Sequence, residues 1–564
     1  MSDTHFDAVV VGSGFGGSVL AYRLAEAGKS VCVLERGKPY PPGSFPRSPA
    51  DLGKAFWDPS EGLYGMFNLW SFKGIGALVS SGLGGGSLIY ANVLLRKDEK
   101  WFVQEDLANG GYEHWPVTRA DLDPHYDAVE RMMNAQRYPF EHAPFDRSAK
   151  TAAFREAAGK LGREWILPPL AVTFANEGED PAVGVPIREE HENLHGLPRY
   201  TCRLTGECDI GCNFGSKNTL DYNYLSAAKR HGAEIWTRRE VRSFAPRQGH
   251  GYVVRYVEHD VADEGRKLKT SDPAVRPVRE LTCDRLVLSA GALGSTYLLL
   301  KSRRDFPDLS PRLGSRFGGN GDLLTFALKA SYPDGSPRRL DAEFGPVITS
   351  AIRVPDALDG GEGRGFYVED AGFPQFMSWI IQTTQGPGAL WRYRKVAARI
   401  IMSLLRRKPE GDLSAEVAEL LSDSRVSAGS LPLLGMGRDI PDGTFSLKDE
   451  ERLQLDWVKA KSGPFFDGLG DFAHEIADAL GAKFQRNPTW YLGRLITVHP
   501  LGGCPMGRTA DEGVVDEYGE VHGYPGFTIA DGSVMPGPVG PNPSLTIAAL
   551  ADRFAERATA RGSA

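Results

Sequence analysis

Two polar residues near the C-terminus, His499 and Asn542, stand in short segments rich in glycine and proline. The first segment reads Val-His-Pro-Leu-Gly-Gly-Cys and the second Val-Gly-Pro-Asn-Pro-Ser. Histidine is the side chain whose ordinary pKa suits proton transfer near neutral pH, and a stiff backbone holds such a group in one place. The alternative is that His499 caps a turn and Asn542 caps the last helix. The pattern therefore predicts either a proton-transfer site completed from the end of the chain or a pair of caps.

The elements that would position this pair begin with a βαβ pattern at the N-terminus. A β-branched run at 6–11 is typical of a buried parallel strand. It leads into Gly-Ser-Gly-Phe-Gly-Gly and then into a helical pattern over 18–27. A second apolar run at 31–34 ends at an acid. The order of strand, glycine-rich turn, helix, strand and acid predicts a dinucleotide-binding unit.

Each glycine of the turn has its own expected role. Gly12 permits the tight turn, Gly14 lets the backbone approach a pyrophosphate, and Gly17 packs the helix against the strand. The phosphates would lie at the helix N-terminus, where free N–H groups favour negative charge. Glu35 has the spacing of an acid that bonds a ribose 2′-hydroxyl, which favours an adenosine ribose without a 2′-phosphate.

Two later segments favour FAD over NAD as the dinucleotide. A hydrophobic strand at 285–292 breaks at Ala-Gly, and another at 527–533 ends in an acid beside glycine. With the N-terminal unit they resemble the three cofactor-contacting segments of the glutathione-reductase-like FAD fold, although either one alone reads as an ordinary strand end. The cofactor contacts expected from them are Ala290, Gly291, Asp531 and Gly532.

Composition limits the classes of protein that this chain can belong to. At 564 residues it is too long for one simple core, so two domains are expected. Hydrophobic and charged contents of 41% and 24% are ordinary for a globular enzyme. A net charge of −7 and the lack of a basic stripe argue against nucleic-acid binding. The first strand starts too early for a secretion signal and no run of about 20 apolar residues occurs, so a cytoplasmic protein is expected.

Six cysteines do not make a disulfide framework in a chain of this length, and reduced thiols are expected. Cys202, Cys208 and Cys212 raise the question of a metal. Their spacing contains no C-x-x-C pair, and no nearby Cys or His completes a closed zinc site. An iron–sulfur centre would need Cys283 or Cys504 as a further ligand. We therefore predict packed thiols and no metal site.

Further motifs carry a family resemblance. The segment 82–92, Gly-Leu-Gly-Gly-Gly-Ser-Leu-Ile-Tyr-Ala-Asn, is similar to the flavin-contacting signature of the glucose–methanol–choline (GMC) oxidoreductases. So are 212–219 and 290–295, and the His499-to-Asn542 C-terminus completes the set. Asparagine at the second C-terminal position, rather than histidine, looks most like the cholesterol oxidase branch, as does 319–322, Gly-Asn-Gly-Asp. The contacts with FAD that the resemblance adds are Gly84, Gly85, Gly86, Ser87, Asn92, Val241, Asn542 and Pro543.

The resemblance implies a mechanism. His499 would hydrogen-bond the substrate hydroxyl and help to remove its proton, while the carbinol carbon passes a hydride to flavin N5. Asn542 would hydrogen-bond near the flavin and the reacting oxygen. Tyr90 and its neighbours include no histidine where some relatives attach flavin covalently, so a non-covalent FAD is expected.

A third candidate residue, Glu369, lies in a segment at 367–374 that loosely resembles the one supplying the active-site glutamate of the cholesterol oxidase branch. There the glutamate is the base for double-bond migration after oxidation. A carboxylate in an apolar pocket would have a raised pKa. The alternative is a solvated acid at a strand edge.

A stretch at 386–434 is longer than the cholesterol oxidase pattern suggests, and we interpret it as an insertion. Within it, 390–408 has the pattern of an amphipathic helix with a basic stripe, ended by Pro409. Three interpretations are open: a helix packed on the substrate domain, a helix lying on a membrane surface, or a lid over the substrate pocket.

The predicted fold class is α/β plus α+β. A discontinuous FAD-binding domain with a parallel sheet is assigned to 1–45, 215–316 and 505–564, and a substrate-binding domain on a largely antiparallel sheet to 46–214 and 317–504. The expected reaction is oxidation of a bulky apolar secondary alcohol, with O2 or a quinone or protein as electron acceptor. A non-redox flavoprotein lyase of the same family is the rival function.

Overall fold

A seven-stranded sheet contains the N-terminal βαβ unit. The computed structural model describes residues 4–47, 49–269, 276–373, 428–491 and 493–560. β1 (His5–Val11) pairs in parallel with β2 (Val31–Leu34), and α1 (Phe15–Glu26) connects them. The helix begins three residues earlier than its apolar pattern indicates, because the glycines at 16 and 17 form part of its first turn. Small residues are needed there, where the helix lies directly on the sheet.

The sheet joins segments from three parts of the chain. β15 (Arg279–Leu288) pairs in parallel with β1 on one side and with β24 (Phe527–Ile529) on the other. These are the two later strands that the sequence assigns to the cofactor site. The remaining strands are β12 (Glu234–Trp236), β13 (Arg239–Pro246) and β14 (Tyr252–Glu258), in the order β12-β2-β1-β15-β14-β13. β2 and most of β1 are buried, as is typical of parallel strands. Near them α1 contacts α5 (Tyr224–Arg230) and α13 (Ser544–Ala560), and α3 (Arg119–Met132) packs on α13.

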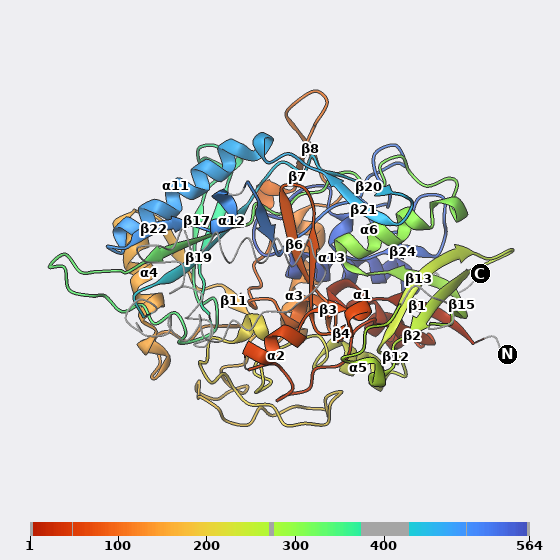
Figure 1. Cartoon of the computed structure of the whole chain (residues 1–564), viewed down its shortest axis with the longest axis horizontal. Helices are drawn as coiled ribbons and strands as arrows, with labels where there is room; N and C mark the ends of the chain where they lie inside the picture. Colours follow the sequence, from red (N-terminus) through yellow and green to blue (C-terminus); the bar gives the residue numbers. More distant parts are fainter. Residues whose placement is uncertain (1–3, 48, 270–275, 374–427, 492, 561–564) are drawn as a thin grey trace.

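A six-stranded antiparallel sheet forms the second unit, to the left of the first in Figure 1. Its order is β10 (Glu164–Ile166), β17 (Ala351–Val354), β18 (Phe366–Asp370), β19 (Leu431–Gly437), β16 (Leu323–Leu328) and β22 (Lys483–Arg486). Together the two sheets confirm the predicted fold class.

Side chains alternate between the two faces of this second sheet, as the pleat requires. Val368 and Leu433 are buried in a core with the apolar stripe of α11 (Gly463–Ala479), which includes Phe465, Phe466, Leu469 and Phe472. Their neighbours along the strands, Glu369 and Leu434, point to the opposite face. One face therefore builds the core, and the other is free to build a site.

A small sheet carries the chain toward His499. β23 (Leu495–Thr497) pairs in parallel with β6 (Ile75–Ser80), which pairs with β5 (Phe67–Ser71). His499 follows β23 by two residues. The other elements are α2 (Pro49–Lys54), β3 (Trp57–Asp58), β4 (Leu63–Tyr64), β7 (Val103–Glu105), β8 (Tyr112–His114), β9 (Gln136–Arg137), α4 (Ala149–Lys160), β11 (Pro169–Leu170), α6 (Gly291–Lys301), β20 (Thr444–Lys448), β21 (Arg452–Asp456) and α12 (Pro488–Tyr491).

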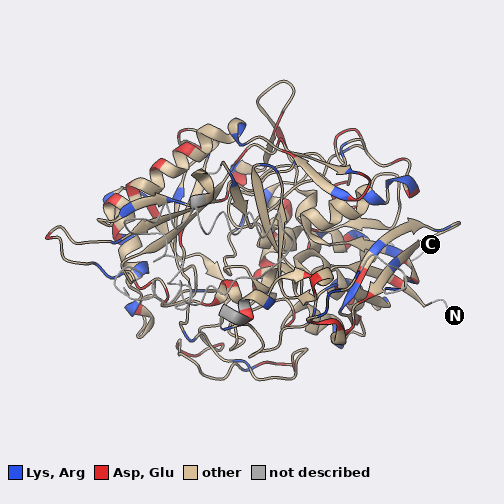
Figure 2. Cartoon of the chain, in the orientation of Figure 1, with Lys and Arg blue, Asp and Glu red and all other residues tan. Residues whose placement is uncertain are grey.

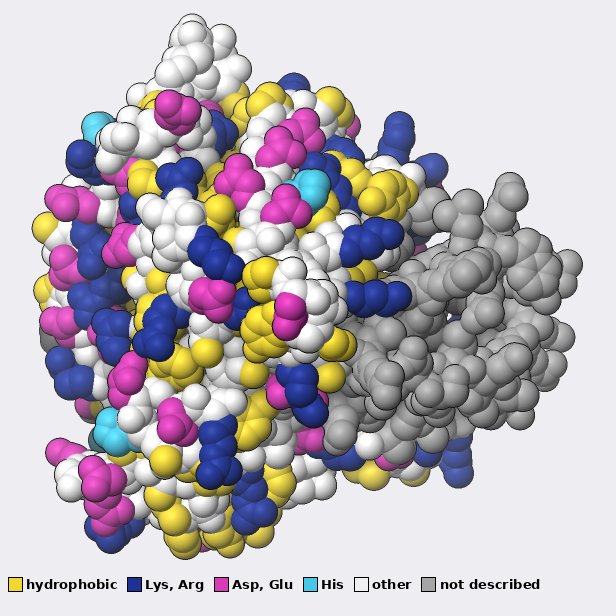
Figure 3. Space-filling view, turned by 90° about the vertical axis from the view of Figure 1, so that its left-hand side faces the viewer, with side chains coloured by type: hydrophobic (Ala, Val, Ile, Leu, Met, Phe, Trp, Pro, Cys, Tyr) yellow, Lys and Arg dark blue, Asp and Glu magenta, His cyan; other side chains and the backbone are white. Residues whose placement is uncertain are grey.

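The predicted basic helix at 390–408 lies outside the described residues, so its three interpretations stay open. Residues 431–434, the end of the predicted insertion, belong to β19. None of the helices in the described ranges is both long and apolar enough to cross a bilayer. In the view of Figure 2, acidic and basic side chains are intermixed over the described residues, and in Figure 3 small apolar patches lie between charged groups of both signs.

Candidate functional site

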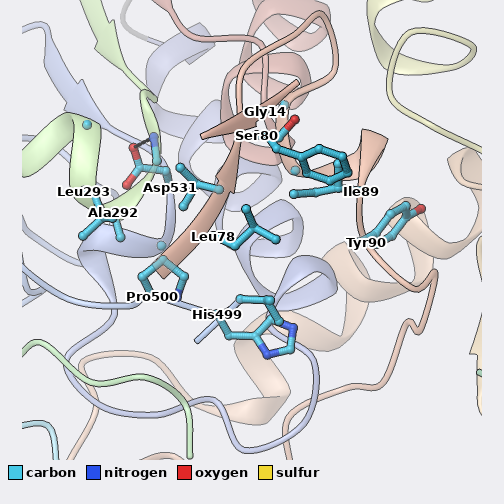
Figure 4. Close-up of a pocket in the computed structure, with 18 of the residues that line it drawn as sticks. Gly14, Leu78, Ser80, Ile89, Tyr90, Ala292, Leu293, His499, Pro500 and Asp531 are labelled. Carbon is cyan, nitrogen blue, oxygen red and sulfur yellow. Dashed lines mark hydrogen bonds between the residues drawn. The ribbon is translucent and has the colours of Figure 1, made fainter. Parts of the chain in front are cut away.

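A large cavity, of about 1410 Å³, brings the two sheets and the small sheet together. The first sheet contributes the turn after β1, the end of β2 and the segment after β15. The second sheet contributes the face opposite α11, and the small sheet contributes Leu78 and Ser80. In Figure 4, His499 lies at the bottom of the view with Leu78 above it, Gly14 lies at the top and Asp531 to the left. A cavity of this size, lined mainly by apolar groups with a few polar ones, is typical of a ligand site.

The glycines of the first turn differ in what surrounds them. A Cβ on Gly12 (φ +97°) would lie 2.3 Å from the carbonyl oxygen of Ser289, and one on Gly17 would lie 2.1 Å from the carbonyl oxygen of Gly12. A Cβ on Gly14 would meet no protein atom within 4 Å, and Gly14 lines the cavity. At positions 12 and 17 a side chain would clash with the protein's own backbone, so packing requires glycine. At Gly14 the space is open and suits a pyrophosphate at the N-terminus of α1.

We expect Gly14→Ala to weaken FAD binding by roughly tenfold while the protein still folds, because a methyl group would compete with the cofactor and not with the chain. Gly16→Ala is the contrasting variant, since its Cβ would lie 1.6 Å from the carbonyl oxygen of Ala530 and must disturb the fold. The ratio of flavin to protein absorbance after dialysis, measured with the melting temperature, checks both. Equal flavin retention in Gly14→Ala and the wild type would contradict the assignment.

Glu35 lies at the end of β2 and is buried. Its carboxylate accepts hydrogen bonds from the Ser13 hydroxyl (2.6 Å), the Ser13 N–H (3.2 Å) and the Gly37 N–H (2.8 Å). These bonds fix the acid beside the glycine-rich turn, where it lines the cavity as a ribose-binding group would. Val241 on β13 lines the same end of the cavity.

Hydrogen bonds on the side away from the cavity support the glycine-rich loop at 82–87. Gly84 and Gly85 have φ of 104° and 53°, in the left-handed region that favours glycine. The hydroxyl of Ser87 donates to the carbonyl of Gly84 (2.7 Å) and accepts from the N–H of Leu220 (3.1 Å). Gly85 and Gly86 line the cavity, but Gly84, Ser87 and Asn92 do not. Gly84 and Ser87 thus lie behind the wall as supports of the loop, and Asn92 is buried outside the cavity lining.

The later segments meet at the other side of the turn. Asp531 accepts hydrogen bonds from the N–H of Gly291 (3.0 Å) and the N–H of Ser533 (2.8 Å), and burial raises the pKa of this carboxyl. The predicted contacts Ala290, Gly291, Asp531, Gly532, Asn542 and Pro543 all line the cavity. Residues from three separate parts of the sequence therefore fit a dinucleotide that extends from α1 toward His499.

Asp322, to which sequence reasoning gave no role, holds His499 in place. Its Oδ1 lies 2.7 Å from His499 Nδ1, and its Oδ2 accepts from the N–H groups of Val498 (2.8 Å) and His499 (3.1 Å) and from the Thr497 hydroxyl (2.8 Å). A carboxylate that accepts from Nδ1–H leaves Nε2 as the proton acceptor. The His499 ring is therefore fixed, with Nε2 on the side of the cavity. His499 does more than cap a turn.

We expect Asp322→Asn to lower kcat about tenfold with FAD retained. An asparagine can accept from the three donors at Oδ2 only by turning its NH2 toward His499 Nδ1, which disfavours the Nδ1–H tautomer. Steady-state kinetics on flavin-loaded enzyme measures the effect, and Asp334→Asn, on an exposed turn, is the control. Equal kcat in Asp322→Asn and the wild type would show that the carboxylate does not position the ring.

Glu369 and Asn542 form a buried pair. The Asn542 amide donates to Glu369 Oε2 at 3.4 Å, and Glu369 is 0% exposed. Burial raises the pKa of Glu369 to about 8, and the nearby Asp370 and Asp322 add to the rise while the Asn542 hydrogen bond opposes it. Within the described part of the chain, Glu369 Oε1 and Asn542 Oδ1 have no hydrogen-bond partner. Asn542 therefore bonds to an acid rather than to the backbone of α13 as a cap would.

The loop that carries Asn542 is fixed by a second asparagine. The Asn320 amide donates to the carbonyls of Gly540 (3.2 Å) and Pro541 (3.0 Å), and the Gly540 N–H donates back to Asn320 Oδ1 (2.9 Å). Asn320 and Asp322 lie two residues apart at the start of β16, so one short segment orients both His499 and the loop of Asn542.

The three clustered cysteines line a second, small cavity. Cys202 is buried, and Cys208 and Cys212 are partly buried beside a cavity of about 20 Å³. Across the residues that the structure describes, no group of three or more His, Cys, Asp and Glu side chains has a metal-binding arrangement.

Comparisons with known proteins agree with this geometry. The GMC oxidoreductase family model matches residues 478–551, and an NAD(P)-binding Rossmann-like domain matches 10–40. The chain is 31% identical over 568 residues to the cholesterol oxidase of Mycobacterium tuberculosis (strain ATCC 25618 / H37Rv), covering 98% of this chain and 90% of the relative. It is 26% identical to the cholesterol oxidase of Acinetobacter baumannii, covering 97% and 93%. The crystal structure of pyridoxine 4-oxidase from Mesorbium loti has the same fold, with a TM-score of 0.59 at 17% identity over 99% of this chain and 100% of that one.

Proposed function

Because this chain belongs to the GMC oxidoreductase family and is therefore an FAD enzyme that oxidises alcohols, we propose that its substrate is a bulky, apolar, sterol-like secondary alcohol. The cavity carries the proposal. The part of the lining that β16 and β19 supply, here called the floor, includes Leu324, Phe326, Pro432 and Leu434. Such a floor excludes water from the reacting carbon and favours a substrate with a large hydrophobic surface. The cholesterol oxidase relatives support the same substrate class.

His499 is the proton-transfer group in this proposal. Its Nε2 accepts the proton of the substrate hydroxyl while Asp322 holds the ring by Nδ1. Bound FAD supplies the acceptor for the hydride that leaves the carbinol carbon, at N5 of the isoalloxazine. Asn542 lies on the same wall of the cavity and positions the oxygen that becomes the carbonyl. The absence of a histidine near Tyr90 supports a non-covalently bound cofactor.

A second activity, migration of a double bond after oxidation, is favoured by Glu369. A base for this step takes a proton from the carbon beside the new carbonyl and returns it further along the conjugated system. Glu369 is buried and is not among the residues that line the cavity, but Asn542, to which it is hydrogen-bonded, is. A carboxyl with its pKa raised to about 8 is basic enough for that exchange once it is ionised. We therefore expect isomerisation, where the substrate carries a suitable double bond, to become faster as the pH rises toward 8.

Anaerobic mixing of the holoenzyme with alcohols tests the main proposal. Bleaching of the visible flavin absorbance by steroid alcohols, and not by short alcohols, is the expected result. Persistent yellow colour with every alcohol would overturn the proposal and favour a lyase. Air is then admitted to the reduced enzyme: rapid return of colour identifies O2 as the acceptor, and slow return that a quinone accelerates identifies a dehydrogenase.

A further inference from the structure

Two carboxamide side chains line the cavity at the edge of the second sheet: Gln485 on the edge strand β22, and Asn487 directly after it. The mechanism uses neither of them. Both are half-buried, and both stand among apolar neighbours. A polar group placed on an otherwise apolar wall fixes the orientation of what binds there.

The sheet register shows where the carboxamides stand relative to the reacting residues. Glu369 pairs with Leu434, and Leu434 pairs with Leu324. The N–H of Asn487 donates to the carbonyl of Leu324 (3.3 Å), which continues the same row. Directly paired residues share a face of a sheet. The row therefore consists of Glu369, Leu434, Leu324 and Asn487, with an acid at one end, an amide at the other and two leucines between them.

A second row runs parallel to the first. Pro432 pairs with Phe326, and Phe326 pairs with Gln485. Each row thus ends in an amide at the same edge of the sheet. Four apolar side chains separate the amides from the Glu369–Asn542 pair: Leu324, Phe326, Pro432 and Leu434.

The strand spacing gives the separation between the two polar ends. Three strand intervals of about 4.8 Å place Asn487 roughly 14 Å from Glu369 along the row of paired residues. A skeleton of four fused rings would extend along this row, with its reacting end toward the Glu369–Asn542 pair and its other end toward the amides.

The orientation of one amide is fixed. Asn487 Oδ1 accepts from the Thr489 N–H (3.0 Å) and from the Thr489 hydroxyl (3.1 Å). Its NH2 group is therefore left to donate, and among the described residues neither this group nor the Gln485 amide has a hydrogen-bond partner. Donors of this kind bind a carbonyl, hydroxyl or carboxylate oxygen.

We infer that the substrate carries a second oxygen, a ketone, hydroxyl or carboxylate, at the end opposite the reacting hydroxyl, and that Gln485 and Asn487 bind it. The inference rests on the proposed function and narrows it. An apolar alcohol with a hydrocarbon tail would leave both amides without partners in the complex, which is costly for polar groups that binding desolvates. An alcohol with oxygen at both ends satisfies them.

The experiment titrates flavin-loaded enzyme with two steroid ketones that share one skeleton, and it follows the flavin absorbance. The monoketone carries only the oxygen that oxidation would produce, and the diketone adds a second at the opposite ring. Gln485→Leu removes one amide. Asn487→Asp keeps the acceptor for Thr489 but replaces the donors. Lys483→Leu, on the same strand but exposed and away from the cavity, is the matched control.

We expect the wild type and Lys483→Leu to bind the diketone about tenfold more tightly than the monoketone, and either amide variant to lose most of this preference. Equal binding of the two ketones by the wild type, or a preference that survives in both amide variants, would overturn the inference while leaving the proposed function intact. If neither ketone binds and no steroid alcohol bleaches the flavin, the proposed function fails and the inference fails with it.

Discussion

Replacement of His499 by alanine is expected to lower kcat by about 10²-fold or more while FAD stays bound, which is the scale of a positioned proton-transfer group. The ring is the residue's main contribution to the site. Its backbone N–H is held by Asp322 and would stay so in the variant. The imidazole is partly exposed to the cavity and belongs to none of the hydrophobic cores, so its loss should leave the fold undisturbed.

Single-turnover reduction of the flavin by substrate measures this effect without interference from reoxidation. His250→Ala is the control, since that histidine is 74% exposed and is not among the residues that line the cavity. We also expect Asp322→Asn to have little further effect when it is combined with His499→Ala, because the carboxylate acts through the ring. Turnover of His499→Ala close to that of the wild type would remove His499 from the mechanism.

Glu369→Gln is expected to make the protein more stable at alkaline pH. The pKa of Glu369 rises from an ordinary value of 4.5 to about 8 in the folded protein. Folding therefore carries no cost from this group below about pH 4.5. The cost grows as the pH rises and is complete above about pH 8, where it amounts to roughly 4–5 kcal/mol. Glutamine carries no charge at any pH and avoids this cost.

Thermal unfolding of the wild type and Glu369→Gln from pH 5 to pH 9 checks the effect. The two melting temperatures should be similar at pH 5 and should separate as the pH increases, with the variant higher. Glu362→Gln, on an exposed turn before β18, is the matched control and should follow the wild type. A constant difference between Glu369→Gln and the wild type across this range would show that Glu369 does not titrate in the folded state as burial requires.

Local pattern was sufficient for the cofactor half of the fold. The strand, turn, helix and strand of the N-terminus are contiguous, although the atoms that require glycine at 12 and 16 belong to Ser289 and Ala530 in later segments. The start of α1 was placed too late, because Gly16 and Gly17 carry no apolar signal although they lie in its first turn.

The contact between Asp322 and His499 could not be predicted from local sequence pattern. The two residues are 177 positions apart, and they meet only because β16 and the turn after β23 cross at the cavity. An acid next to glycine in the sequence looks like an ordinary turn residue. Glu369 was identified only through resemblance to a family motif. Its burial depends on which face of β18 turns toward α11, and this follows from the pairing of β18 with β19.

Side chains alternate between the two faces of the second sheet, so residues on the same strand are under two kinds of selection. Those that face the core are selected for stability, and those that face the cavity are selected for substrate binding. Substitutions at Val368 or Leu433 act on the core with α11 and are tested by folding. Substitutions at Leu324, which is next to the core residue Leu323, act on the cavity and are selected by the substrate, since Leu324 lines the cavity and belongs to none of the hydrophobic cores. A lineage with this sheet can therefore change the molecule that it accepts without weakening its core. Within a single strand, substrate preference and stability can evolve independently.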